Sequence, residues 1–202
     1  TQAAQLSTTQ IGGLASTQVG AMTTTAFAAL NATQVGALSA TQVKGLTSSQ
    51  LTSLSTTDVG ELTSTQLGAL AVSQLASLSA ANFSALTSTQ TAGLNTTQVR
   101  GITATQVRGL SQADLGELTA TQVGALTTSQ LGQLSGTVIG ALTTTQIGQL
   151  QATQMSGLTT TQLDSLTTTS ISALTSTQAN ALTTAQVQSL SPDQVAAYVG
   201  VI

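Results

Sequence analysis

An apolar residue recurs at every eighth position of this 202-residue chain, from Leu6 to Leu190 without a gap. Of these 24 positions, 22 hold leucine, and Met22 and Ile102 fill the other two. With these positions called a and the octad lettered a to h, b is Ser, Thr or Asn in 21 octads and e is Gln in 18. Position f is apolar in every octad except at Thr91, and 16 of the 18 glycines stand at g or h. Such a period is typical of a repeat architecture, in which each unit buries its apolar side against its neighbours.

The three-residue spacing from b to e predicts the start of a helix in almost every octad. A Ser or Thr followed three residues later by Gln forms a capping box, in which each side chain accepts a hydrogen bond from the other residue's backbone N–H. The residues at a and f then occupy the two positions of a hydrophobic staple. In the last full octad, Pro192 falls at the first helical position and Asp193 at the second, where a fixed φ and a negative charge suit a helix start. We therefore expect one helix of about six residues in each octad.

The octad period disfavours longer regular elements. A continuous helix has about 3.6 residues per turn, so a repeat of eight does not stay on one face. In a single strand, a and f would lie on opposite faces, because they are five residues apart. A β-solenoid with turns that interrupt every octad stays open as the alternative, because Thr and Val favour strands.

A helix of this length is unstable alone in water, so its stability has to come from stacking. Stacked octads would join their a and f side chains in one core, and the small residues at g and h would let neighbouring helices approach closely. The sequence thus predicts an all-α solenoid of very short capped helices, one per octad.

Departures from the consensus recur every seven octads. Glutamine is missing from position e in two series with that spacing: Ala26, Asn82 and Val138, and Asp58, Asp114 and Ser170. The same spacing separates Lys44 from Arg100 and Glu61 from Glu117. These 56-residue blocks predict one uninterrupted array over residues 1–202, with 24 octads from Leu6 and an apolar C-terminal tail at 198–202.

In the third block, the places of Lys44, Asp58 and Glu61 are taken by Ser156, Ser170 and Ala173. This joint loss predicts that each base lies near the acids that follow it, which would make elements two octads apart neighbours. We expect Lys44 near Asp58 or Glu61, and Arg100 near Asp114 or Glu117.

The amino-acid composition excludes several classes of function. Only 4% of the residues are charged, with three bases against six acids, and nucleic-acid binding needs a basic surface. The chain has no cysteine and no histidine, so disulfides, thiol chemistry and a histidine-dependent triad are excluded. No apolar run is long enough to span a membrane. The chain starts without methionine or a leader, which indicates a mature form, a fragment or an expression product. We expect no enzyme activity, no cofactor and no resident metal.

A few polar groups are candidates for binding. Asp58 with Glu61, and Asp114 with Glu117, are acid pairs three residues apart, but calcium takes six to eight oxygens and a solvated pair is the simpler interpretation. Ser and Thr at b, c and d would form long hydroxyl-rich faces. Such faces make a binding protein for ice or polysaccharide the alternative function.

Three asparagines, Asn31, Asn82 and Asn95, begin triplets that match the glycosylation pattern of Asn followed two residues later by Ser or Thr. Asn31 and Asn95 stand at b, where a helix cap explains them.

The tandem L-[ST]-x-x-Q-[VI]-x-x octapeptides resemble the repeat tracts of large secreted or cell-surface bacterial proteins, as in "LTATQVGALTTSQLGQL" from Leu118 to Leu134. The resemblance covers nearly the whole chain and transfers no functional residue. It implies an extracellular or cell-surface location and a structural or adhesive role, as a scaffold, a stalk or a filament subunit. Contact with a cell surface or a polysaccharide is the partner it implies.

End-to-end self-association is the most specific functional expectation. A solenoid exposes its core at both ends unless polar units cover it, and two uncovered ends that fit each other give open filaments. The candidate assembly interface comprises residues near both ends of the chain: Thr1, Gln2, Ala3, Tyr198, Val199, Val201 and Ile202.

Overall fold

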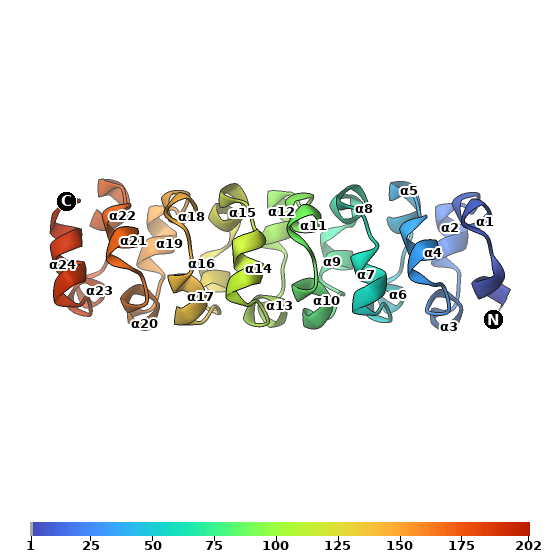
Figure 1. Cartoon of the computed structure of the whole chain (residues 1–202), viewed down its shortest axis with the longest axis horizontal. Coiled ribbons are helices and arrows are strands. Elements are labelled where there is room, and N and C mark those ends of the chain that lie inside the picture. Colours follow the sequence, from blue (N-terminus) through green and yellow to red (C-terminus); the bar gives the residue numbers. More distant parts are fainter. Residues whose placement is uncertain (1) are drawn as a thin grey trace. The chain divides into compact units, whose positions relative to one another are not determined.

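The computed structural model describes residues 2–202, and within this range the protein is an all-α solenoid of very short helices, one per octad (Figure 1). No strand occurs among the described residues, so the β-solenoid alternative is wrong. The chain forms two compact units, Thr1–Gln106 and Val107–Ile202, which are described separately.

Unit 1 contains a short 3-10 helix, η1 (Gln2–Gln5), and then α1 (Thr8–Gly12), α2 (Ser16–Gly20), α3 (Thr24–Phe27), α4 (Ala32–Gly36), α5 (Ala40–Val43), α6 (Ser48–Thr52), α7 (Thr56–Gly60), α8 (Ser64–Ala69), α9 (Val72–Leu75), α10 (Ala80–Ser84), α11 (Ser88–Ala92) and α12 (Thr96–Arg100). The division between the units falls within α13 (Ala104–Arg108). Unit 2 contains α14 (Gln112–Glu117), α15 (Ala120–Ala125), α16 (Thr128–Leu131), α17 (Gly136–Gly140), α18 (Thr144–Gly148), α19 (Ala152–Ser156), α20 (Thr160–Asp164), α21 (Thr168–Ser172), α22 (Ser176–Asn180), α23 (Thr184–Gln188) and α24 (Pro192–Val199).

The expected capping box starts these helices. In α5, the Ser39 hydroxyl accepts from the backbone N–H of Gln42 at 3.2 Å, and Gln42 Oε1 accepts from the N–H of Ser39 at 2.7 Å. Ser39 itself is extended, so the chain enters each helix from an extended residue. Where b is alanine, as at Ala15 and Ala71, only the glutamine half of the box forms. Pro192 stands at the predicted first position of α24.

Most helices are five residues long, slightly shorter than the six expected. They end because the next a residue donates back to the f carbonyl, as Leu46 N–H does to Val43 at 3.2 Å, and the chain then becomes extended. No described residue, glycine included, has a positive φ. The short helices therefore stop without a left-handed residue.

The predicted a and f residues form the core of each unit. In unit 1, Val43, Leu51 and Leu67 at f are 0% exposed, and in unit 2 the same holds for Leu131 and Ile147. The leucines at a are also buried along most of the chain, with exposed fractions of a few per cent. The apolar repeat thus builds a continuous core within each unit.

Helices three octads apart pack against each other. The contacts join α2 with α5, α5 with α8, α15 with α18, and α21 with α24. Figure 1 shows α5 and α8 along one edge of unit 1, and α15, α18 and α22 along one edge of unit 2. The expectation that elements two octads apart are neighbours is wrong, because one turn of the coil takes more than three octads.

Close approach explains some of the glycines, as expected, but not all. A Cβ added to Gly68 on α8 would lie 2.6 Å from the backbone oxygen of Gly93, which follows α11. A Cβ on Gly60, the last residue of α7, would meet nothing within 4 Å. The glycines at g therefore divide into those pressed against the next coil and those with space around them.

Candidate functional site

The glutamines at position e connect successive turns of the coil. While Oε1 caps its own helix, the Nε2 group donates to backbone oxygens of an earlier coil. Gln98 Nε2 lies 2.8 Å from the oxygen of Leu70 and 2.9 Å from that of Leu67, which are 28 and 31 residues earlier. In unit 2, Gln162 Nε2 makes the same bonds to Leu134 at 2.7 Å and Leu131 at 2.8 Å.

We call this series the glutamine ladder. Its members with a bond to the a residue 28 positions earlier are Gln34, Gln42, Gln50, Gln66, Gln74, Gln90, Gln98 and Gln106 in unit 1, and Gln146, Gln154, Gln162, Gln178, Gln186 and Gln194 in unit 2. All of them are buried, with exposed fractions of 7% or less. The bonds satisfy backbone oxygens that would otherwise be buried without a donor at the helix ends.

The ladder step gives the size of one coil, about three and a half octads. Asp58 and Glu61 follow Lys44 along the chain by about half of that step. About half a coil of chain therefore separates Lys44 from these acids, and their expected proximity stays a prediction. The corresponding prediction for Arg100 stays a prediction.

Two of the glycosylation-like asparagines are helix caps, and the third is buried. Asn31 and Asn95 are the N-caps of α4 and α12. Asn82 is 3% exposed and donates to the Leu54 oxygen at 2.8 Å, in the place of a ladder glutamine. Its shorter side chain makes the same bond to the a residue one ladder step earlier.

In the acid pair of unit 2, the pKa of Glu117 is raised. Partial burial, and secondly the carboxylate of Asp114, raise the pKa of Glu117 above its usual 4.5. Among the described residues, no group of three or more metal-ligating side chains lies together. No helix in this range has the length and apolarity needed to cross a membrane.

The described candidate assembly residues belong to two different units. Gln2 and Ala3 belong to η1, and Thr1 lies outside the described residues. Tyr198 and Val199 form the last turn of α24, and Val201 and Ile202 follow it. The tail therefore starts as helix, although Tyr198 stands at the next a position.

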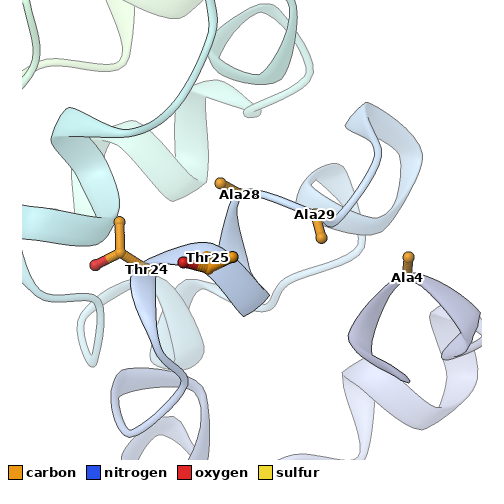
Figure 2. A pocket seen from close by; sticks show the side chains of 5 residues that line it. All are labelled: Ala4, Thr24, Thr25, Ala28 and Ala29. Carbon is orange, nitrogen blue, oxygen red and sulfur yellow. The ribbon is translucent and has the colours of Figure 1, made fainter. Parts of the chain in front are cut away.

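The surface at the N-terminal end of unit 1, which we call the N face, is hollow and mainly apolar. A groove of about 460 Å³ is lined by Gln2, Ala3, Leu6, Leu14, Gln18, Met22 and Ala26. Leu6, Leu14 and Met22 are a residues that are only half-buried, because no coil among the described residues covers them. A second hollow beside it is lined by Thr24 and Thr25 of α3, by Ala28 and Ala29, and by Ala4 of η1 (Figure 2). Its lining offers methyl groups and two hydroxyls.

The surface at the C-terminal end of unit 2, which we call the C face, exposes apolar side chains. Val199 and Ile202 are each 60% exposed, and Val195, an f residue, is 37% exposed. Tyr198 and Val201 are half-buried, and the Val201 oxygen accepts from the Ser176 hydroxyl at 2.9 Å. Four further apolar residues of these faces were not predicted from the sequence, although their a and f positions were the available signal: Leu6, Leu14, Met22 and Val195.

Position d provides the repetitive polar surface. Every d residue from Thr9 to Asp193 is exposed, and most are threonine or serine. The hydroxyls at b are also on the surface, but most of them accept the capping hydrogen bond of their own helix. The hydroxyls that do not cap a helix therefore stand mainly at positions c and d.

Comparisons with family models, with curated proteins and with solved structures returned no match to this chain. The class of protein is accordingly defined by the fold and the ladder: an all-α solenoid whose coils are joined by buried glutamine side chains.

Proposed function

We propose that this chain is a non-enzymatic structural protein that self-associates end to end and serves outside the cell or at the cell surface as a scaffold, stalk or filament subunit. The glutamine ladder is the observation that supports it best. Each coil is held to the one before it by a buried core and by repeated amide-to-carbonyl bonds, a plan that extends by addition of like units.

The two end faces support the self-association part of the proposal. Both expose apolar side chains that are buried in the equivalent positions of inner octads. The sparse charge of the chain, three bases and six acids, leaves little repulsion between copies.

Analytical ultracentrifugation of the whole chain tests this proposal. The weight-average mass is expected to rise as the protein concentration is raised to about 100 µM. At this concentration an association with a Kd of about 100 µM is detectable. Electron microscopy of the concentrated sample should then show filaments. A mass that stays at 20.0 kDa over the whole range would rule out self-association.

A repetitive binding face is the second candidate, and the exposed d hydroxyls favour it. Regularly spaced Thr side chains would suit an ordered surface such as ice or a polysaccharide. A thermal-hysteresis assay and a polysaccharide pull-down test this candidate. Replacement of Thr145, Thr153 and Thr161, all at d, by Lys should abolish binding and leave the circular dichroism spectrum unchanged.

A further inference from the structure

At the C face, three backbone oxygens at position a accept no hydrogen bond from a ladder glutamine. The last ladder glutamine is Gln194, which donates to the Leu166 oxygen at 2.7 Å. The next three a residues are Leu174, Leu182 and Leu190, whose backbone oxygens accept no hydrogen bond from any described residue. Position 202 stands one ladder step after Leu174, and it is isoleucine instead of glutamine.

The N face carries three e glutamines that have no acceptor. Among the described residues, Gln34 is the first glutamine with a ladder bond, to the Leu6 oxygen at 2.7 Å. Gln2, Gln10 and Gln18 occupy the preceding e positions and are exposed. Gln10 and Gln18 use Oε1 in their own caps at 2.8 Å, and their Nε2 groups donate to no described residue.

We propose that the N face of one copy docks on the C face of another and continues the glutamine ladder. The amides of Gln2, Gln10 and Gln18 then donate to the backbone oxygens of Leu174, Leu182 and Leu190. The inference rests on the proposed self-association and adds the occupant of each face and its register.

The register follows from the spacing of the donors and acceptors. Both sets are eight residues apart, and all three bonds form together only when Gln2 of the incoming copy takes the place of position 202. The incoming copy is then offset by a whole number of octads, so the repeat continues in phase. Val201 and Ile202 stand where its first two residues would lie, so this tail is displaced on docking.

The apolar side chains of the two faces support the same contact. Leu6, Leu14 and Met22 line the groove of the N face, and inner residues of the same octad position are buried by an adjoining coil. The exposed Val195 of the C face is an f residue, whose inner equivalents are 0 to a few per cent exposed. Docking in the ladder register gives each face the adjoining coil that it lacks.

A pair of introduced cysteines tests the register directly, because the chain has none of its own. Inside unit 1, a Cβ at Gly36, a g residue, lies 3.5 Å from that of Glu61, the h residue three octads further on. This distance suits a disulfide. In the proposed register the same relation joins Gln188 of one copy to Gly13 of the next. A Cβ at Gly13 would have only ordinary contacts, with 3.5 Å to its nearest neighbours, so Gly13→Cys should fold.

The variant with Gly13→Cys and Gln188→Cys is expected to form end-to-end disulfide multimers under mild oxidation. The matched control combines Gly13→Cys with Asn180→Cys, an exposed g residue one octad earlier, and should form several-fold fewer. Equal crosslinking of the two variants, or none in either, would overturn the register. If the wild type still associates in the ultracentrifuge, the proposed function stands without the ladder contact.

Substitution of the donors tests the hydrogen bonds themselves. In Gln10→Glu with Gln18→Glu, a carboxylate oxygen still caps each helix, but the N–H donor is gone. Self-association should weaken about tenfold or more, because the acceptors of the partner copy lose their donors and face a carboxylate instead. The control Thr9→Glu with Thr17→Glu adds the same charge to the same helices at exposed d positions. An equal loss in both double variants, or no loss in the glutamine variant, would contradict the ladder contact.

Discussion

A ladder glutamine contacts two helices with one side chain. Oε1 of Gln98 accepts from the Asn95 N–H at 2.9 Å, and its Nε2 group donates to Leu70 and Leu67. Glutamate could replace only the first contact. The preference for Gln over Glu at position e therefore reflects the second contact, in which only an amide can donate to backbone oxygens.

This difference predicts unequal effects of the same substitution along the chain. Gln98→Glu should lower the free energy of unfolding by roughly 3 kcal/mol or more, because it buries a carboxylate against two carbonyl oxygens. Gln18→Glu should change it by less than about 0.5 kcal/mol, because Gln18 is exposed and keeps its cap. Urea denaturation of dilute monomer measures both. Similar losses at the two positions would refute the ladder as a stabilising feature.

The raised pKa of Glu117 makes a second prediction, on pH dependence. A carboxyl with a raised pKa in the folded state binds its proton more tightly there than in the unfolded chain. It therefore costs stability as pH rises from its usual 4.5 through the raised value. Glu117→Gln removes this loss, so the variant should gain stability relative to wild type between about pH 4 and pH 7. Urea denaturation at both pH values checks it, with Glu61→Gln at the exposed equivalent position as the control. A gain that is the same at both pH values would contradict the assignment.

At the scale of the helix, the sequence specifies much of the structure locally. The capping box and staple predict where each helix starts, and Ser39 with Gln42 shows the predicted bonds. The helix end was less predictable, because a five-residue helix stops when the next a residue turns back to the f carbonyl. The sequence also did not reveal which coil each glutamine reaches, since the coil length depends on packing between octads.

The glycines at g differ in whether a neighbouring helix lies close to them. Gly60→Ala should raise the free energy of unfolding by about 0.5–1 kcal/mol, because alanine favours the helix and a Cβ there meets nothing within 4 Å. Gly68→Ala should lower it, because its Cβ would lie 2.6 Å from the Gly93 oxygen and force the two helices apart. Thermal denaturation of the two variants should therefore shift the midpoint in opposite directions. Shifts of the same sign would show that close approach does not govern the glycine positions.

At the scale of the molecule, the coil length accounts for the seven-octad super-repeat within each unit. One coil takes about 28 residues, so an octad returns to the same side of the solenoid only after two coils, or seven octads. Residues that depart from the consensus, such as Ala26 and Asn82, therefore recur on one side of unit 1. The sequence contained this period but not its cause, because the period of the coil is invisible until the ladder bonds are known.

The candidate interface was only partly foreseeable from the sequence. Val199 and Ile202 of the tail were predicted because they are apolar and depart from the octad pattern, and both are exposed. Leu14 and Met22 of the N face are half-buried, although they stand at the same octad position as buried residues further along the chain. The octad position alone could not separate them, because their exposure depends on how many other described coils pack against them.

The ladder also predicts which deletions the solenoid tolerates. Each ladder bond joins an e glutamine to the a residue 28 positions earlier, and that pairing of e with a survives when a whole octad is removed. Deletion of positions 46–53 should therefore leave a folded helical protein whose melting midpoint falls by only several degrees.

Deletion of positions 46–49 removes only half an octad. The residue 28 positions before each of the next glutamines of unit 1 is then an e residue and no longer an a residue, and its side chain already caps its own helix. The a and f residues on either side of the cut also lose their register. Circular dichroism melting should then show a large loss of helix and of cooperativity, although less of the chain is removed. A half-octad deletion that melts like the octad deletion would mean that general apolar packing, and not the glutamine ladder, sets the register of the coils.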